Sequence, residues 1–369
     1  MKQDVGWREI LAPLSVAFAA RADAADENDA YVAQNMAELK ESGLLAAGVP
    51  GELGGMGLEV GALCELLAEV ARGCSSTALA LSMHTHQVAV NAWRWRHAKA
   101  PVGPLLERVA RERLQLLSTG AGDWLYGSGE ARKVEGGYRL RARKSFVSGV
   151  LSGDLLLSSA VEGGTVLHFA LPMKGDGIRI EQTWRTLGMR ATGSHDVLLE
   201  DAFLPDQAVS LRRPQGAWHP LFHLIVLLAL PLIYSVYVGV AERARDISLG
   251  LARRRPGADQ LLQQVGELEN ALAKAKIAHA DMVRSATSAA PGMETTNRVL
   301  AARALVAEGV LQTVSAALET AGGAAFYRSK GLERLFRDAQ AARYHPLAQV
   351  PQKDLAARLA LGLEVKQAG

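Results

Sequence analysis

The residues best suited to proton chemistry stand near the end of the chain, in the run RDAQAARYHPLAQ of residues 337–349. His345 follows Tyr344 and precedes Pro346, and the next carboxylate is Asp354. An imidazole titrates near neutral pH, so His345 is a candidate proton acceptor. The alternative is a loop histidine without a chemical role, and the local sequence leaves both interpretations open.

Two other patterns contain catalytic or ligating residue types but predict no site. Ser194, His195 and Asp196 carry the side chains of a hydrolase triad, yet neighbouring residues on a strand point to opposite faces. His84 and His86 are two residues apart on an expected helix and therefore lie on different sides of it. We expect no metal site.

Composition excludes several classes of partner. The 369 residues include 41 basic and 38 acidic side chains, giving a net charge of +3, which is too balanced to predict a nucleic-acid partner. The two cysteines, Cys64 and Cys74, form no CxxC motif, which favours buried thiols in a reducing, cytoplasmic setting.

One apolar segment needs a separate interpretation. Residues 221–241, LFHLIVLLALPLIYSVYVGVA, carry no formal charge and are long enough to cross a bilayer. His223, Pro231 and two tyrosines interrupt the apolar run, and no second such segment accompanies it. We therefore favour a helix buried on all sides within a helical bundle, and expect no membrane partner.

Hydrophobic periodicity divides the chain into three regions. Residues 1–112 show apolar side chains at three- and four-residue spacing, which predicts an N-terminal helical domain. Residues 113–212 alternate in short runs separated by glycine-rich turns, which predicts a central antiparallel sheet domain. Residues 213–369 predict a C-terminal four-helix bundle, with long helices at 221–251, 258–289 and 293–321 and shorter ones at 331–342 and 350–363. The predicted fold class is α+β.

Four motifs, in order, give the chain a family resemblance. They are GVPGELGGMGLEV at 48–60, WRTLGMRATGSHDVLLEDAFLP at 184–205, ALETAGGAAF at 317–326 and LERLFRDAQ at 332–340. Together they resemble the acyl-CoA dehydrogenase superfamily over nearly the whole chain. The resemblance implies a flavin, usually FAD, between the sheet and the C-terminal helices of a homodimer or homotetramer.

The resemblance assigns residues to the flavin ring. Phe146 in KSFVSG matches an aromatic side chain stacked on the isoalloxazine, and Ser148 matches a hydroxyl at the flavin N5 edge. Ser118 and Thr119 in LLSTGAGD match groups that bind the flavin pyrimidine and the substrate. Here the sequence departs from the family, whose usual Thr-Glu-Pro start is replaced by Ser-Thr-Gly.

The same resemblance assigns a nucleotide end and a substrate cleft. An arginine of LARRRPGADQ matches one that binds the pyrophosphate of a neighbouring subunit's FAD, since its planar fork suits phosphate oxygens. Candidates for the nucleotide end are Arg253, Arg254, Arg255, Gln264, Gly322 and Gly323. Candidates for lining the substrate cleft are His86, Trp124, Tyr126 and Tyr344.

The catalytic glutamate of the family has no counterpart. One of its two places falls on His345 or Pro346, and the other falls within FHLIVLLALPLI, which has no carboxylate. The default expectation remains FAD-dependent oxidation of an acyl-CoA or related small molecule at a CH–CH bond, with His345 as the substitute base and electron-transfer flavoprotein as a possible partner.

The alternative is the reduced-flavin monooxygenase branch, similar to dibenzothiophene monooxygenase. Its members react reduced flavin (FMN or FAD) with O2, receive that flavin from a partner reductase and need no base for an α-proton. The empty glutamate positions favour this branch.

Overall fold

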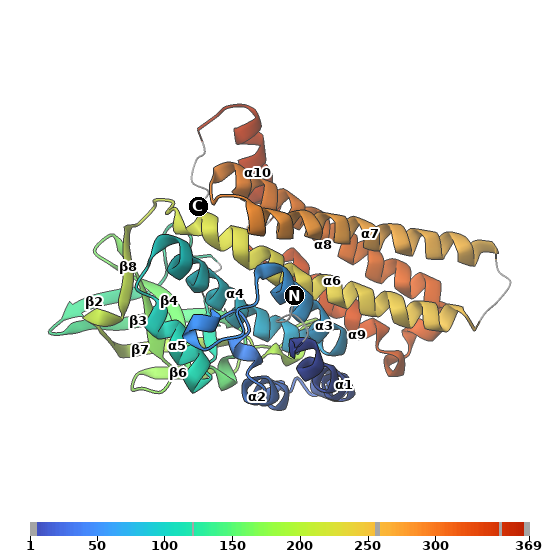
Figure 1. Ribbon diagram of the computed structural model, residues 1–369, viewed down its shortest axis with the longest axis horizontal. Coiled ribbons are helices and arrows are strands. Elements are labelled where there is room, and N and C mark those ends of the chain that lie inside the picture. Colours follow the sequence, from blue (N-terminus) through green and yellow to red (C-terminus); the bar gives the residue numbers. More distant parts are fainter. Residues whose placement is uncertain (1–5, 120–121, 255–258, 347–348, 365–369) are drawn as a thin grey trace.

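The computed structural model describes residues 6–119, 122–254, 259–346 and 349–364, in three regions along one long axis (Figure 1). The N-terminal region is helical. Its helices are α1 (Gly6–Glu27), α2 (Ala33–Glu41), α3 (Val60–Gly73), α4 (Ser75–Ala98) and α5 (Gly103–Glu112). These helices pack beside the sheet and along the near half of the C-terminal helices (Figure 1).

The middle of the chain forms one sheet at one end of the molecule (Figure 1). Its strands are β1 (Leu116–Ser118), β2 (Glu130–Val134), β3 (Gly137–Val147), β4 (Leu155–Glu162), β5 (Thr165–Pro172), β6 (Ile178–Glu181), β7 (His195–Pro205) and β8 (Val209–Pro214). The order is β6-β7-β3-β2-β4-β5-β8, with β1 beside β4. Neighbours are antiparallel except that β4 runs parallel to β1 and to Glu130, the first residue of β2. These parallel pairs depart from the predicted antiparallel sheet, because β1 enters from α5 and not from a hairpin.

The C-terminal region has three long helices and two short ones. They are α6 (Leu221–Ala252), α7 (Asp259–Ser288), α8 (Met293–Ala321), α9 (Leu332–Ala339) and α10 (Gln349–Ala360). The long helices agree with the predicted ranges within one or two residues, and the α+β class is confirmed. Within the described residues, the predicted C-terminal helical bundle consists of these three long helices and the two short helices α9 and α10, so it has five members where four were predicted.

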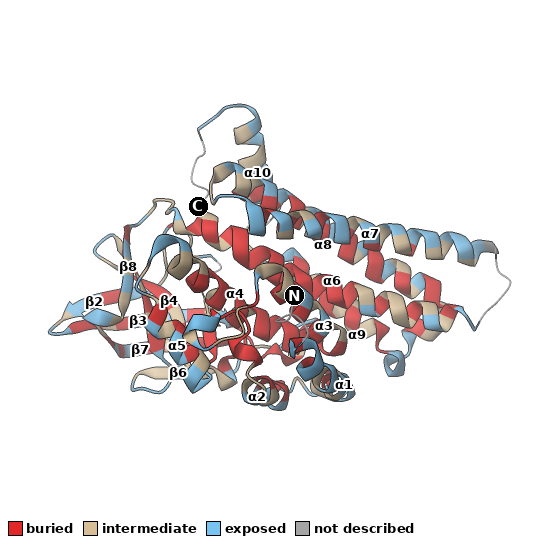
Figure 2. Cartoon of the chain, in the orientation of Figure 1, coloured by how far each residue is buried: buried red, intermediate tan, exposed pale blue. Residues whose placement is uncertain are grey.

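Helix α6 is the centre of the helical core. Among the described residues, two helical segments, Leu221–Ala252 and Met293–Phe326, are long and apolar enough to cross a membrane by length and composition, so the expectation of a single such segment was wrong. The most apolar window of α6 is 94% buried, because α3, α4, α7, α8 and α9 all pack against it (Figure 2). Packing within the fold therefore accounts for its apolar sequence, as predicted.

The helices of both ends share a single hydrophobic core. Its buried side chains include Leu11 and Leu66 from the N-terminal region and Tyr234 and Val310 from the C-terminal region. The sheet has its own separate cluster, which includes Leu140. The sheet, at one end of the molecule, therefore has its own core beside the shared core of the helices (Figure 1).

Candidate functional site

A bulge in β3 presents Phe146 to the outside of the sheet. Lys144 pairs with Val197 of β7, but the next paired residue is Val147, so the register shifts between them. Phe146 lies at the shift with φ +61°, a left-handed backbone that is rare for an aromatic residue, and its side chain is 67% exposed. Trp184 meets it edge to face, with ring centroids 6.1 Å apart. The bulge therefore holds a flat apolar surface open.

A chain of buried hydroxyls leads away from the same bulge. Ser148 Oγ lies 2.8 Å from Ser194 Oγ, and Ser194 Oγ lies 2.7 Å from Thr192 Oγ1. Thr192 Oγ1 donates to the carbonyl oxygen of Met189 over 2.9 Å. The predicted flavin-contacting residue Ser148 is thus the last member of a hydrogen-bonded series that starts in the segment before β7.

His86 and Ser118 form a hydrogen-bonded pair at the end of β1. His86 Nδ1 donates to the Ser82 carbonyl over 3.0 Å, and burial lowers the His86 pKa to about 4 and keeps the ring neutral. The Ser118 hydroxyl therefore donates to His86 Nε2 over 3.2 Å and accepts from Gln87 Nε2 over 3.1 Å. Thr119 Oγ1 donates to Ser158. The structure therefore brings His86, predicted to line the cleft, to Ser118, predicted to contact the flavin. The hydroxyls of Ser118 and Thr119 both already form hydrogen bonds within the chain.

Two buried cations anchor the loop of residues 122–128 that follows Thr119. Lys144 Nζ lies 3.0 Å from Asp123 Oδ2 and 2.8 Å from the Ser128 carbonyl, and its side chain is 2% exposed. Arg213 donates to the carbonyls of Leu125 and Asp123 over 2.6 and 2.9 Å. The loop is therefore fixed to β3 and β8, and it carries Trp124.

The cleft residues of this loop are aromatic neighbours of the start of α6. Trp124 stacks on Phe222 with ring centroids 5.4 Å apart and tilts against Trp218 at 5.5 Å. Tyr126 is 53% exposed and Tyr344 is 79% exposed. The structure places Trp124 within an aromatic cluster, whereas Tyr126 and Tyr344 stand at the surface of this chain.

His345 is engaged by a buried tyrosine. Its Nε2 lies 2.5 Å from the Tyr237 hydroxyl, and Arg303 donates to its carbonyl over 2.5 Å. Burial, followed by the positive charge of Arg303, lowers the pKa of His345 to about 3. The same cause raises the pKa of Tyr237 well above its ordinary value. At neutral pH the pair is uncharged.

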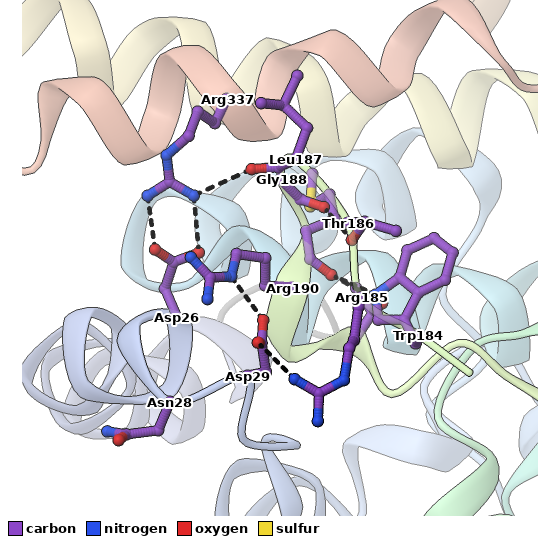
Figure 3. Close-up of polar contacts among 12 residues, drawn as sticks. Asp26, Asn28, Asp29, Trp184, Arg185, Thr186, Leu187, Gly188, Arg190 and Arg337 are labelled. Atoms are coloured by element: carbon purple, nitrogen blue, oxygen red, sulfur yellow. Dashed lines mark hydrogen bonds and ion pairs between the residues drawn. The ribbon is translucent and has the colours of Figure 1, made fainter. Parts of the chain in front are cut away.

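Helix α9, which leads to His345, is fastened to the segment before β7 (Figure 3). Arg337 forms a bidentate ion pair with Asp26, with the shorter N–O distance 2.6 Å, and donates to the Leu187 carbonyl over 3.1 Å. Asp338 is 1% exposed and accepts from the Met189 N–H over 2.5 Å. The Arg-Asp pair of the sequence motif therefore joins α1, α9 and the segment that carries Trp184.

The predicted nucleotide-end residues lie far from the bulge. Arg253 and Arg254 are exposed at the end of α6, Gln264 is half-buried on α7, and Arg255 lies outside the described residues. The α6–α7 junction is at the end of the molecule opposite the sheet (Figure 1). Gly322 ends α8 with φ +64°, and Gly323 has open space around it. One chain does not bring the described residues of this set to Phe146, and their assignment to a neighbouring subunit's flavin stays a prediction.

Sequence reasoning missed most of the residues that support the site. They are Lys144, Arg213, Tyr237, Trp184, Thr192 and Ser194. Ser194 was weighed only as part of a triad, and no local pattern relates it to Thr192, because Thr192 ends a 3-10 turn and β7 begins only at His195. A lysine inside an otherwise alternating strand was the available signal for Lys144.

The residues at the bulge fit an isoalloxazine ring. Phe146 supplies an exposed flat surface held in a strained backbone, Trp184 supplies an apolar edge, and Ser148 supplies one polar contact. Within the described residues, no group of three or more His, Cys, Asp or Glu side chains could hold a metal ion. The arrangement can therefore bind a planar ring and can supply neutral hydrogen-bonding groups around it.

Comparisons with known proteins extend over both helical regions. Residues 14–95 match the family described as acyl-CoA dehydrogenase, N-terminal domain, and residues 232–350 match acyl-CoA dehydrogenase, C-terminal domain. The putative acyl-CoA dehydrogenase YdbM of Bacillus subtilis is 26% identical, with 92% of each chain covered. The amino sugar nitrososynthase RubN8 of Streptomyces rubradiris is 29% identical, with 93% of this chain and 87% of that protein covered. The structure of KijD3 in complex with FMN and dTDP-3-amino-2,3,6-trideoxy-4-keto-3-methyl-D-glucose has a TM-score of 0.90 at 25% identity, with 100% of this chain and 96% of that chain covered.

Proposed function

The chain belongs to the acyl-CoA dehydrogenase family, and we propose that it acts within that family as a reduced-flavin-dependent monooxygenase. One atom of O2 enters a small-molecule substrate, the other leaves as water, and the reduced flavin is oxidised. The observation that carries this proposal is the absence of a carboxylate from both positions at which the family places its catalytic glutamate. One falls on His345 or Pro346, and the other falls in an apolar stretch of α6 without a carboxylate.

The chemistry of His345 supports the proposal over acyl-CoA oxidation. Desaturation of an acyl thioester needs a base for the α-proton, which is typically worth about 10²–10⁴ in rate. A pKa of about 3 leaves His345 little tendency to take a proton from carbon at neutral pH, and Tyr237 already engages its Nε2. Neutral imidazole and hydroxyl groups suit an oxygenation that does not begin with this proton transfer.

The flavin side supports FMN as the cofactor. Reduced flavin, when bound, supplies the two electrons that O2 requires. Phe146 and Trp184 would hold the ring and exclude water from one face, and Ser148 would contact its polar edge. FMN is the flavin of the KijD3 complex, and FMN needs no adenylate contacts of the kind expected at Arg253.

A flavin reductase is the partner that this chemistry requires, and the substrate is a small molecule that meets the aromatic cluster around Trp124. Relatives that are named amino sugar nitrososynthases support oxygenation at a nitrogen atom as one such reaction. The buried free thiols of Cys64 and Cys74 support a reducing, cytoplasmic location.

A homo-oligomer is supported by the outer face of the C-terminal helices. A groove of about 1150 Å³ runs between α7, α8 and α10, and small side chains such as Ala271, Ala304 and Ala307 lie along it. On α7, outside this groove, Leu262 is 77% exposed and Ile277 is 70% exposed. Small residues allow helices to approach closely, and exposed leucine and isoleucine on a helix favour association.

Two experiments test the proposed reaction, the first of them without oxygen. Oxidised flavin bound to the protein is mixed with a panel of acyl-CoAs, and its absorbance should stay unchanged. Bleaching by an acyl-CoA would establish the dehydrogenase alternative and overturn the proposal. Separately, protein with reduced FMN is mixed with O2, and flavin reoxidation is followed against free reduced FMN. The protein should change the rate and the spectral course of reoxidation, and identical traces would contradict oxygen activation at this site.

A further inference from the structure

We propose that the hydroxyl chain Thr192–Ser194–Ser148 fixes Ser148 as a hydrogen-bond acceptor and so makes the site selective for reduced over oxidised flavin. The inference rests on the proposed function, because it takes flavin as the molecule that binds beside Phe146. It goes further by assigning the choice of flavin redox state to two residues, Thr192 and Ser194, that lie behind the contacting hydroxyl.

The direction of the chain follows from the one hydrogen that each hydroxyl carries. Thr192 donates its hydrogen to the Met189 carbonyl, which can only accept. Towards Ser194, Thr192 must therefore accept, so Ser194 donates to it over 2.7 Å. Towards Ser148, Ser194 in turn must accept, so Ser148 donates its only hydrogen over 2.8 Å. Because the Ser148 hydrogen is used in this bond, Ser148 Oγ can act only as a hydrogen-bond acceptor towards a molecule bound beside it.

Burial prevents a simple reversal of this direction. Thr192 is 0% exposed, Ser194 is 2% exposed and Ser148 is 8% exposed, so bulk water has little access to the chain. Among the described residues, Ser194 Oγ has hydrogen bonds only with these two neighbours. A backbone hydrogen bond also holds the two ends of the hydroxyl chain together, because the N–H of Gly149, next to Ser148, donates to the Thr192 carbonyl over 2.9 Å. A dry, fully connected series keeps one arrangement of its protons.

The two forms of flavin differ at the atom that the resemblance assigns to Ser148. N5 of oxidised flavin is an acceptor, whereas N5 of reduced flavin carries a hydrogen and can donate. An acceptor hydroxyl satisfies the reduced form and leaves two acceptors facing each other in the oxidised form. The penalty for an unsatisfied buried polar group corresponds to about tenfold to a hundredfold in affinity.

Equilibrium binding of FMN in both redox states tests the inference without any turnover. Dissociation constants are measured anaerobically for oxidised and for dithionite-reduced FMN, by titration with protein. The wild-type chain should bind reduced FMN about tenfold to a hundredfold more tightly. In Ser194→Ala, Ser148 loses its acceptor and can turn its hydrogen to oxidised N5. Oxidised FMN should then bind more tightly, and the ratio should fall to within about threefold.

Thr192→Val is an independent second variant. Without the Thr192 hydroxyl, Ser194 can donate its hydrogen to Ser148. The Ser148 hydrogen is then available to oxidised flavin, so the preference for reduced over oxidised FMN should fall as in Ser194→Ala. Thr313→Val is the matched control, since Thr313 is 0% exposed and donates to the Gly309 carbonyl within α8. It removes an equally buried hydroxyl and should leave the ratio unchanged. Thermal unfolding of each variant without flavin establishes that it is folded.

The outcomes separate the inference from the function on which it rests. If the wild-type chain binds both forms with equal affinity, or if Ser194→Ala and Thr192→Val keep the wild-type ratio, the inference is wrong while the flavin site stands. If the folded wild-type chain binds neither form, the proposed function fails and the inference fails with it.

Discussion

Replacing Asp338 tests how helix α9 holds the segment that carries Trp184. The carboxylate is 1% exposed, accepts from the Met189 N–H and the Ser75 hydroxyl, and lies 3.8 Å from Arg334. Met189 has φ +53°, so this hydrogen bond also holds a left-handed backbone. Burial raises the pKa of Asp338 above its ordinary value. Its oxygen atoms therefore matter more to stability than its charge does.

Two substitutions of similar size separate the oxygen atoms from the charge. Asp338→Asn keeps an acceptor for Met189 and gains an amide that can donate to Ser75, and we expect it to cost about 1 kcal/mol. Asp338→Leu leaves the buried Met189 N–H without an acceptor and should cost about 2–4 kcal/mol. The gap of about 2 kcal/mol corresponds to roughly 3 °C in the unfolding midpoint of a chain of this length.

Thermal unfolding followed by circular dichroism at neutral pH measures this gap. The same pair of substitutions at Asp354, a 49% exposed carboxylate on α10, is the control and should give midpoints within about 1 °C of each other. Equal midpoints for Asp338→Asn and Asp338→Leu would refute the assignment of Asp338 as the acceptor that holds the Met189 backbone.

Three further outcomes follow from the packing and the buried charges. Gly188→Ala places a Cβ 2.2 Å from the Arg337 carbonyl and should lower the unfolding midpoint by about 1–4 °C, whereas Gly250→Ala, which has open space, should not lower it. Lys144→Met leaves Asp123 without its cation and should cost about 3–5 kcal/mol in urea unfolding, and the added change Asp123→Asn should recover most of this loss. Burial lowers the pKa values of four histidines from 6.5, to about 4 for His84, His86 and His168 and to about 3 for His345. The unfolded chain therefore binds more protons below pH 6.5, and stability should fall from there towards pH 4 by up to about 1.4 kcal/mol per pH unit for each histidine; His84→Gln should reduce the contribution of these four to the slope by about a quarter in urea unfolding at pH 7 and pH 5.

The long helices could be predicted from the sequence because their signals are local. Helices α6, α7 and α8 are each about 30 residues long, and Pro-Gly pairs separate them in the sequence at residues 256–257 and 291–292. The parallel pairing of β1 with β4 has no such signal. It depends on how α5 delivers β1 to the sheet, which is a tertiary arrangement.

The site could be predicted only in part, for a similar reason. Phe146 and Ser148 belong to one short motif, so the resemblance located them together. Their supports come from distant parts of the chain: Ser194 lies 46 residues after Ser148, and Tyr237 lies 108 residues before His345. The engagement of His345 by Tyr237 is the clearest case, because the sequence alone offered His345 equally as a base and as an inert loop residue.

The single helical core has a consequence for how the protein is made on the ribosome. Helices α3 and α4 are complete by Ala98, but α6, the main packing partner of both, begins only at Leu221. The first helices must therefore emerge with their apolar faces uncovered while the whole sheet is synthesised. At about 5–20 residues per second, this interval of more than a hundred residues lasts roughly 6 to 25 seconds. We expect nascent chains that end before α6 to bind chaperones or aggregate, and protection to appear as a single late event once α6 leaves the exit tunnel.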